Sequence, residues 1–197
     1  MAFLLASSAA QALPSISIIW RGVGATLVSP AGTSNHIADI VLTSDVVTIG
    51  GVFISIEFDA AELQAVNATE LAVVNLPGMG NEFAPVSVGT VIDNGAGLII
   101  EFDEATLSTG LVGGVTRTLG SVTFHVVAGA NDNTDIDVIA SLQNPGIDAI
   151  TIAGGGTTNG TFVGASVTGP VVPEPTTALL VIAGLAGLGY AGRRGLR

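Results

Sequence analysis

The chain contains 197 residues, enough for one domain with signals at its ends, and it has neither cysteine nor lysine. Fifteen of its sixteen acidic residues and only two arginines lie between residues 13 and 172, while the other three arginines stand at the extreme C-terminus. This distribution argues against nucleic-acid binding, because phosphate recognition needs clustered basic side chains. The absence of cysteine excludes disulfide bonds and cysteine catalysis.

The first segment, MAFLLASSAAQALPS, is a short apolar run followed by small residues. Ala10 and Ala12 match the two positions before the cleavage site at which signal peptidase requires small side chains. The basic start of a full signal peptide is missing, so residues 1–12 are predicted to be a truncated signal peptide, the alternative being a frayed N-terminus. The mature domain is then expected to cover residues 13–170.

Between these limits the sequence predicts short strands separated by turns. Residues 46–59 contain the alternating stretch GVFISIEFD, typical of a half-buried strand. Within residues 86–103, Asp93-Asn94-Gly95 separates two apolar runs and predicts a hairpin, because Asn and Gly tolerate positive φ. Further strands are predicted over 37–45, 117–129, 135–143, 147–154 and 160–169, and short helical turns over 60–66 and 104–110. Turn signals at intervals of about 8–12 residues are typical of a β-sandwich.

The two histidines do not predict a catalytic centre. His36 lies in the polar stretch SNHIAD, predicted to be a loop. Alternation in SVTFHVV directs Val122, Phe124 and Val126 to the core and His125 to solvent. No Gly-x-Ser-x-Gly nucleophile motif is present.

Two pairs of carboxylates are the only other catalytic candidates. Glycosidases use two carboxyl groups about 5–10 Å apart across a cleft. Alternation places Glu57 with Asp59, and Glu101 with Asp103, on the solvent face of their strands. Solvated strand ends explain these pairs more simply, because acidic residues are mostly exposed.

The stretch NDNTDID is the best candidate for a metal site. Asn131, Asn133, Asp135 and Asp137 alternate along it as oxygen donors do in a calcium loop. Ile136 stands in place of the turn glycine and no glutamate follows at the twelfth position, so this is no EF-hand. An ordinary polar turn between strands is the alternative. We therefore expect no cofactor, with calcium as the alternative.

The C-terminal segment has three parts. The sequence Val-Pro-Glu-Pro comes first, residues 176–192 carry no charge, and arginines follow. As a helix, these 17 residues would span ~25 Å, marginal for a hydrocarbon core of ~30 Å. Small residues recur every fourth position at Ala183, Gly187 and Ala191, as in packed membrane helices. The positive-inside rule then places the arginines in the cytoplasm and the acidic domain outside. A buried helix is the alternative.

This order of parts resembles the PEP-CTERM sorting signal of Gram-negative bacteria. The parts are carried by Pro173, Glu174, Pro175, residues 176–192, Arg193, Arg194 and Arg197. The resemblance covers residues 171–197 and implies that an exosortase reads and removes this segment. It further implies an inner-membrane intermediate, followed by delivery to the cell surface or an extracellular matrix of exopolysaccharide.

A second resemblance concerns the body of the chain. The stretches GVFISIEFDAAELQAVN, IDNGAGLIIEFDEATL and LGSVTFHVVAG are similar to cohesin-like and carbohydrate-binding-module-like sandwiches. In that family a strand ending in an aromatic residue and Asp meets a short turn and a Leu. The expected fold class is therefore all-β, a cohesin-like (jelly-roll or Ig-like) β-sandwich plus one C-terminal transmembrane-type helix.

Together these observations predict a non-enzymatic, exported surface or matrix protein with a structural or adhesive role. The alternative is a cohesin-like module that binds carbohydrate or protein, with or without calcium; a carbohydrate-active enzyme comes third. Trp20 and Tyr190 are the only Trp and Tyr, so few rings are available to stack on sugars. The expected partners are an exosortase-type enzyme, the membrane transiently through residues 176–192, and an exopolysaccharide or another surface protein.

Overall fold

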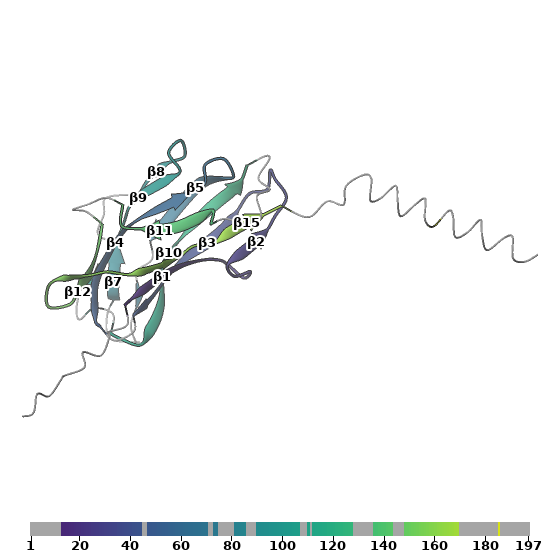
Figure 1. The fold of residues 1–197 in the computed structure, drawn as a ribbon. Helices are drawn as coiled ribbons and strands as arrows, with labels where there is room; N and C mark the ends of the chain where they lie inside the picture. The colour runs from purple at the N-terminus through teal and green to yellow at the C-terminus, as the bar shows by residue number, and fades with distance from the viewer. Residues whose placement is uncertain are drawn as a thin grey trace, which may run out of the picture.

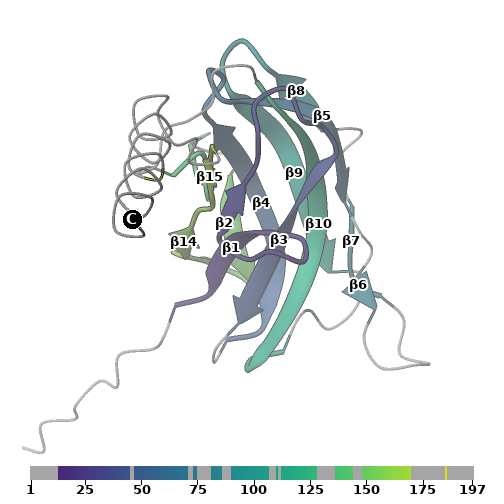
Figure 2. The same ribbon diagram turned by 90° about the vertical axis from the view of Figure 1, so that its right-hand side faces the viewer.

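The computed structural model describes residues 13–44, 47–70, 73–74, 81–85, 90–106, 110, 112–127, 136–143, 148–169 and 185. These residues form strands in two sheets that pack face to face, with a small third sheet at one end (Figures 1 and 2). The high content of Val, Ile and Thr suits pleated, half-buried strands.

The first sheet, here called the β3 sheet, has the order β14-β1-β3-β10-β5. Its strands are β1 (Ser15–Trp20), β3 (His36–Ser44), β5 (Leu63–Glu70), β10 (Val115–Val126) and β14 (Thr161–Val163). Neighbouring strands are antiparallel except β14, which runs parallel to β1.

The second sheet, here called the β4 sheet, has the order β13-β12-β4-β9-β7-β6, with β11 also paired to β4 and β8 to β9. Its strands are β4 (Ile49–Phe58), β6 (Val73–Val74), β7 (Asn81–Pro85), β8 (Val91–Asp93), β9 (Leu98–Thr106), β11 (Val138–Ser141), β12 (Ala149–Ile152) and β13 (Thr157–Thr158). The third sheet pairs β2 (Thr26–Val28) in parallel with β15 (Ser166–Thr168).

The core lies between the two large sheets. Phe124 of the β3 sheet packs edge-on against Phe58 of the β4 sheet, with ring centroids 5.4 Å apart, and against Trp20 at 5.8 Å. Ile54 and Ile56 of β4 are fully buried in the same core, and the outward-facing Ser55 is buried as well. Full burial of a large apolar side chain stabilises the fold by about 1.5–3 kcal/mol, so this interface supplies most of the driving force.

The strands expected from alternation are confirmed. β4 buries the predicted inward residues, and in β10 Val122, Phe124 and Val126 are buried while His125 lies on the other face. The predicted hairpin joins β8 to β9. Its turn is longer than expected, and the positive φ falls on Gly97, whereas Asp93 accepts hydrogen bonds from the backbone of Gly95 and Ala96 at 2.9 and 3.0 Å.

The predicted helical turn over 60–66 is found only at its start, where residues 60–62 form a turn closed by the Leu63 N–H donating to the Asp59 carbonyl at 2.7 Å; the described part of the turn predicted over 104–110 is wrong. Residues 63–66 belong to β5, and β9 continues to Thr106. Leu, Gln and Ala favour helices in isolation, but pairing of β5 with β10 covers Leu63 and Ala65, and this burial overrides local propensity.

Several predicted features lie outside the described residues. These are Ala10, Ala12, Asn131, Asn133, Asp135, Pro173, Glu174, Pro175, Arg193, Arg194 and Arg197. Of the expected C-terminal helix, only Leu185 is described. Among the described residues, no helix is long and apolar enough to cross a membrane.

Candidate functional site

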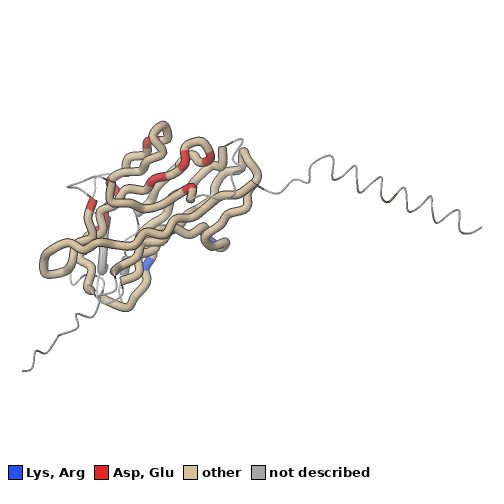
Figure 3. The backbone as a smooth tube through the Cα atoms, viewed as in Figure 1, with Lys and Arg blue, Asp and Glu red and all other residues tan. Residues whose placement is uncertain are grey.

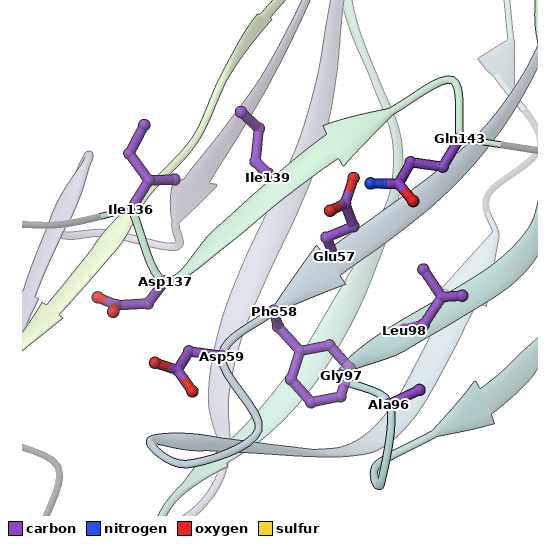
Figure 4. Close-up of a pocket in the computed structure, with 10 residues that line it drawn as sticks. All are labelled: Glu57, Phe58, Asp59, Ala96, Gly97, Leu98, Ile136, Asp137, Ile139 and Gln143. Atoms are coloured by element: carbon purple, nitrogen blue, oxygen red, sulfur yellow. The ribbon is translucent and has the colours of Figure 1, made fainter.

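A cavity of about 340 Å³ opens where β4 ends, beside the β8–β9 turn and the start of β11 (Figure 4). It is lined by Glu57, Phe58, Asp59, Ala96, Gly97, Leu98, Ile136, Asp137, Ile139 and Gln143. The wall therefore combines three carboxylates with aliphatic side chains.

Glu57 reaches the cavity because it occupies an outward position of β4. Its neighbours across the sheet are Leu98 on β9 and Ile139 on β11, so the carboxylate stands between two aliphatic side chains. Gly97 brings the β8–β9 turn close to β4: a Cβ at this position would collide with the carbonyl oxygen of Phe58. The turn can therefore approach β4 only with glycine here.

Asp59 follows the last residue of β4 and begins a tight turn. Its carboxylate accepts a hydrogen bond from the backbone of Ala61 at 2.7 Å, while its carbonyl oxygen accepts from the backbone of Leu63, also at 2.7 Å. The Asp59 N–H donates to the carbonyl of Asp137 at 2.8 Å, which places the two acidic residues beside one another (Figure 4). Backbone hydrogen bonds thus fix the position of the Asp59 side of the cavity.

Asp137 is only 1% exposed and directly precedes β11. Its carboxylate accepts a hydrogen bond from the backbone N–H of Val167, and its own N–H donates to the carbonyl of Ala165 at 3.0 Å. A buried carboxylate requires such donors, because burying a charge without them costs several kcal/mol. Asp137 therefore connects the cavity to β15, the last strand of the domain.

The electrostatic character of this region is negative. No arginine lines the cavity. The described acidic residues gather mainly on the side of the β4 sheet, away from the two described arginines (Figure 3). Arg21 forms an ion pair with Asp39, with 2.5 Å between Nη2 and Oδ1, and this carboxylate raises the pKa of the guanidinium. A ligand of the cavity should therefore carry positive charge and apolar surface.

The calcium candidate is represented in the described part of the chain by Asp137 alone. One oxygen of its carboxylate is already engaged by Val167. Among the described residues, no three acidic or histidine side chains lie close enough to share one ion. The calcium site remains a prediction that depends on Asn131, Asn133 and Asp135.

The two predicted carboxylate pairs differ in where the structure places them. Glu57 and Asp59 both line the cavity. Glu101 is exposed and adopts a positive φ of 60°, whereas Asp103 is 8% exposed, so its prediction as a solvent-facing residue is wrong. The register of β9 against β4 shifts between Ile54 and Ile56. The pairing is regular again from Phe102 onward: Phe102 and Glu104 lie opposite the buried Ile54 and Val52, and Asp103 lies opposite Phe53 on the other face of the sheet. Both faces of β9 are therefore covered at residues 102–104.

His36 is the first residue of β3, not part of a loop, so this prediction is also corrected. Its Nε2 lies 3.0 Å from the hydroxyl of Ser29 and 2.8 Å from that of Thr33. Burial lowers the pKa of His36, and His125 lowers it further. The sequence contains no motif that marks this Ser–His contact, which tertiary folding creates. Ser29 is only 2% exposed, so a substrate could not reach its hydroxyl.

Trp20 does not present a ring to solvent. It is 1% exposed, and its indole N–H donates to the carbonyl of Ser166 at 2.8 Å. A sugar ring needs an accessible aromatic face to stack upon. Trp20 therefore serves the core rather than a surface carbohydrate platform.

Comparison with known proteins adds two findings. Residues 171–195 match the model of the PEP-CTERM protein-sorting motif. No curated protein matches the chain.

Solved structures of similar fold are cohesins. The type II cohesin A11 from Bacteroides cellulosolvens aligns with a TM-score of 0.57 at 9% identity, covering 79% of this chain and 99% of that one. A cohesin in the Coh-OlpC–Doc435 complex from Clostridium thermocellum aligns with a TM-score of 0.53 at 9% identity, covering 83% and 99%. CaCohA2 from Clostridium acetobutylicum gives 0.51 at 13% identity, covering 82% and 94%. At these identities the likeness concerns the fold alone, and it confirms the expected cohesin-like sandwich. The chain thus carries a PEP-CTERM protein-sorting motif behind a domain of the cohesin fold.

Proposed function

We propose that this protein is exported and sorted through its C-terminal motif to the bacterial cell surface or extracellular matrix. The observation that carries the proposal is the match of residues 171–195 to the sorting motif. Residues 1–12 act as an export signal, residues 13–170 as the folded domain and residues 171–197 as the sorting signal. An exosortase-type enzyme reads Pro173, Glu174 and Pro175 while residues 176–192 cross the inner membrane and the arginines stay in the cytoplasm.

At its destination the domain acts as a non-enzymatic module that binds another surface protein. Two observations support this role. Its fold is that of cohesins, and one of the similar structures is a cohesin in complex with a dockerin. The cavity beside Glu57, Asp59 and Asp137 offers carboxylates between aliphatic walls, which suits a lysine or arginine side chain of a partner.

Carbohydrate binding is the weaker alternative. Exopolysaccharide would be a natural ligand in a matrix, but Trp20 is buried and the cavity lining contains a single aromatic residue, Phe58, which is itself mostly buried. A calcium ion held by Asn131, Asn133, Asp135 and Asp137 would rigidify the segment that enters β11.

The sorting proposal is tested by intact-mass analysis of the protein recovered from surface and membrane fractions. We expect a surface form that lacks the residues beyond the Pro173–Pro175 motif. A variant with alanine at Pro173, Glu174 and Pro175 should accumulate unprocessed in the inner membrane. Full-length protein resident there in the unaltered strain would contradict the proposal.

A further inference from the structure

The last strand of the domain is held firmly to the rest of the fold. β15 accepts the indole hydrogen bond of Trp20 through Ser166, and Val167 donates to the carboxylate of Asp137. The carbonyl of Thr168 accepts from the backbone of Ser29 at 2.9 Å. The hydrogen-bonded part of the domain therefore extends to Thr168, three residues before the sorting motif begins at 171.

The tether between domain and membrane is consequently short. Six residues, 170–175, lie between Gly169 and Thr176, and the seven steps from one to the other span at most about 25 Å when fully extended. The sandwich is longer than this tether, since the twelve residues of β10 alone extend about 40 Å. While residues 176–192 are in the bilayer, the end of the domain that bears β2 and β15 therefore stays within about 25 Å of the membrane (Figure 1).

The loop at this end is uncharged, although Asp137 and the exposed Asp59 lie near β15 at the same end. Val28 is the cross-strand partner of Thr168 and is 64% exposed. The segment that follows, SPAGTSN from Ser29 to Asn35, contains no charged residue and exposes Pro30 and Ala31. We call residues 28–35 the tail-end loop.

The tail-end loop is also fixed in place. The backbone of Gly32 donates to the carbonyl of Val126 at 2.9 Å, and Val126 donates back to Thr33 at 2.8 Å. The Thr33 hydroxyl donates to the carbonyl of Pro30 at 2.7 Å. A fixed loop with exposed apolar groups loses little conformational entropy when it enters an interface.

We propose that the tail-end loop rests on the lipid headgroup surface during sorting, with Val28 and Ala31 as its contact residues. This inference depends on the proposed membrane insertion of residues 176–192. The partner is a zwitterionic lipid surface, because an uncharged loop on an acidic domain gains nothing from anionic lipid. Docking would hold the domain in one orientation while the motif is read.

The absence of cysteine allows a direct test with single-cysteine variants of the full chain. Val28→Cys and Ala31→Cys report on the loop. Val112→Cys is the matched control, because Val112 is also exposed, at 48%, and precedes β10 at the opposite end of the sandwich. Each variant is labelled with an environment-sensitive fluorophore and reconstituted into vesicles of phosphatidylcholine and phosphatidylethanolamine containing a headgroup-quencher lipid.

We expect the quencher lipid to reduce fluorescence at positions 28 and 31 at least twofold more than at position 112. Equal quenching at the three positions, in protein that floats with the vesicles, would overturn the loop proposal and leave membrane insertion intact. Failure of the full chain to float would overturn both. Quenching that requires an added exosortase would assign the loop to the enzyme and not to lipid.

Discussion

The indole nitrogen of Trp20 lies 2.8 Å from the carbonyl oxygen of Ser166, although the two residues are 146 positions apart. This bond joins the end of the first strand to the beginning of the last one. Trp20 also packs edge-on against Phe124, so its ring belongs to the core while its polar edge holds β15. The strand that precedes the sorting motif is thereby held in place by the first strand of the domain.

Replacing Trp20 with phenylalanine should retain most of the apolar packing and remove this hydrogen bond. The Ser166 carbonyl would lose its donor, and we expect the free energy of unfolding to fall by about 1–3 kcal/mol. Urea unfolding followed by circular dichroism measures the change, because the only tryptophan is lost as a fluorescent probe. Unchanged stability would show that water replaces the indole at no cost.

The β8–β9 turn offers a matched pair of glycines. Gly97→Ala should destabilise the domain by about 1–3 kcal/mol, because Gly97 has φ of +67° and an added Cβ would collide with Phe58. Gly95→Ala should have a much smaller effect, since the nearest atom, Asp93 Oδ1, is 3.3 Å from the added Cβ. Thermal unfolding of both variants checks the difference. Equal effects would contradict the assigned turn geometry.

Asn94 protects the edge of β5. Its side-chain amide accepts from the backbone N–H of Ala65 at 2.7 Å and donates to the Ala65 carbonyl at 3.0 Å. Asn94→Ala should therefore lower stability by about 1–2 kcal/mol and expose a strand edge that can pair with other copies. Light scattering over a concentration series should detect this association. Asn67→Ala, on the exposed surface of β5, is the control and should remain monodisperse to the same extent as the unaltered protein.

His36 predicts a pH dependence of stability. Its pKa is lowered in the folded state, so protonation favours the unfolded chain. Its stabilising contribution is complete above the ordinary histidine pKa of about 6.5 and is lost as pH falls toward the lower folded pKa. Unfolding free energies measured between pH 7.5 and 5 should decline less steeply in His36→Gln than in the unaltered protein. Parallel declines would assign the pH dependence to other groups.

Calcium removal should leave the melting temperature unchanged. The reason is that Asp137, the described member of the candidate set, already accepts a backbone hydrogen bond from Val167. Calorimetry in EDTA and in millimolar CaCl₂ tests this expectation. A stabilisation by calcium that disappears in Asp135→Asn would contradict it and establish the loop as a metal site.

The sequence by itself determined the features that depend on local pattern. Alternation of β-branched and polar residues predicted β4 and β10 with their buried faces, because side chains of a strand point to opposite sides in turn. The sorting motif was readable for the same reason: its parts are contiguous and need no fold to be recognised.

Only the tertiary structure decided the rest. β5 is a strand because β10 pairs with it, and Asp103 is buried because both faces of β9 are covered at this point of the sheet. Trp20 is buried because it packs against Phe124 and bonds to Ser166. The cavity likewise combines residues from β4, the β8–β9 turn and β11, which are separated by tens of positions. These outcomes follow from long-range packing, in which burial and pairing outweigh local propensity.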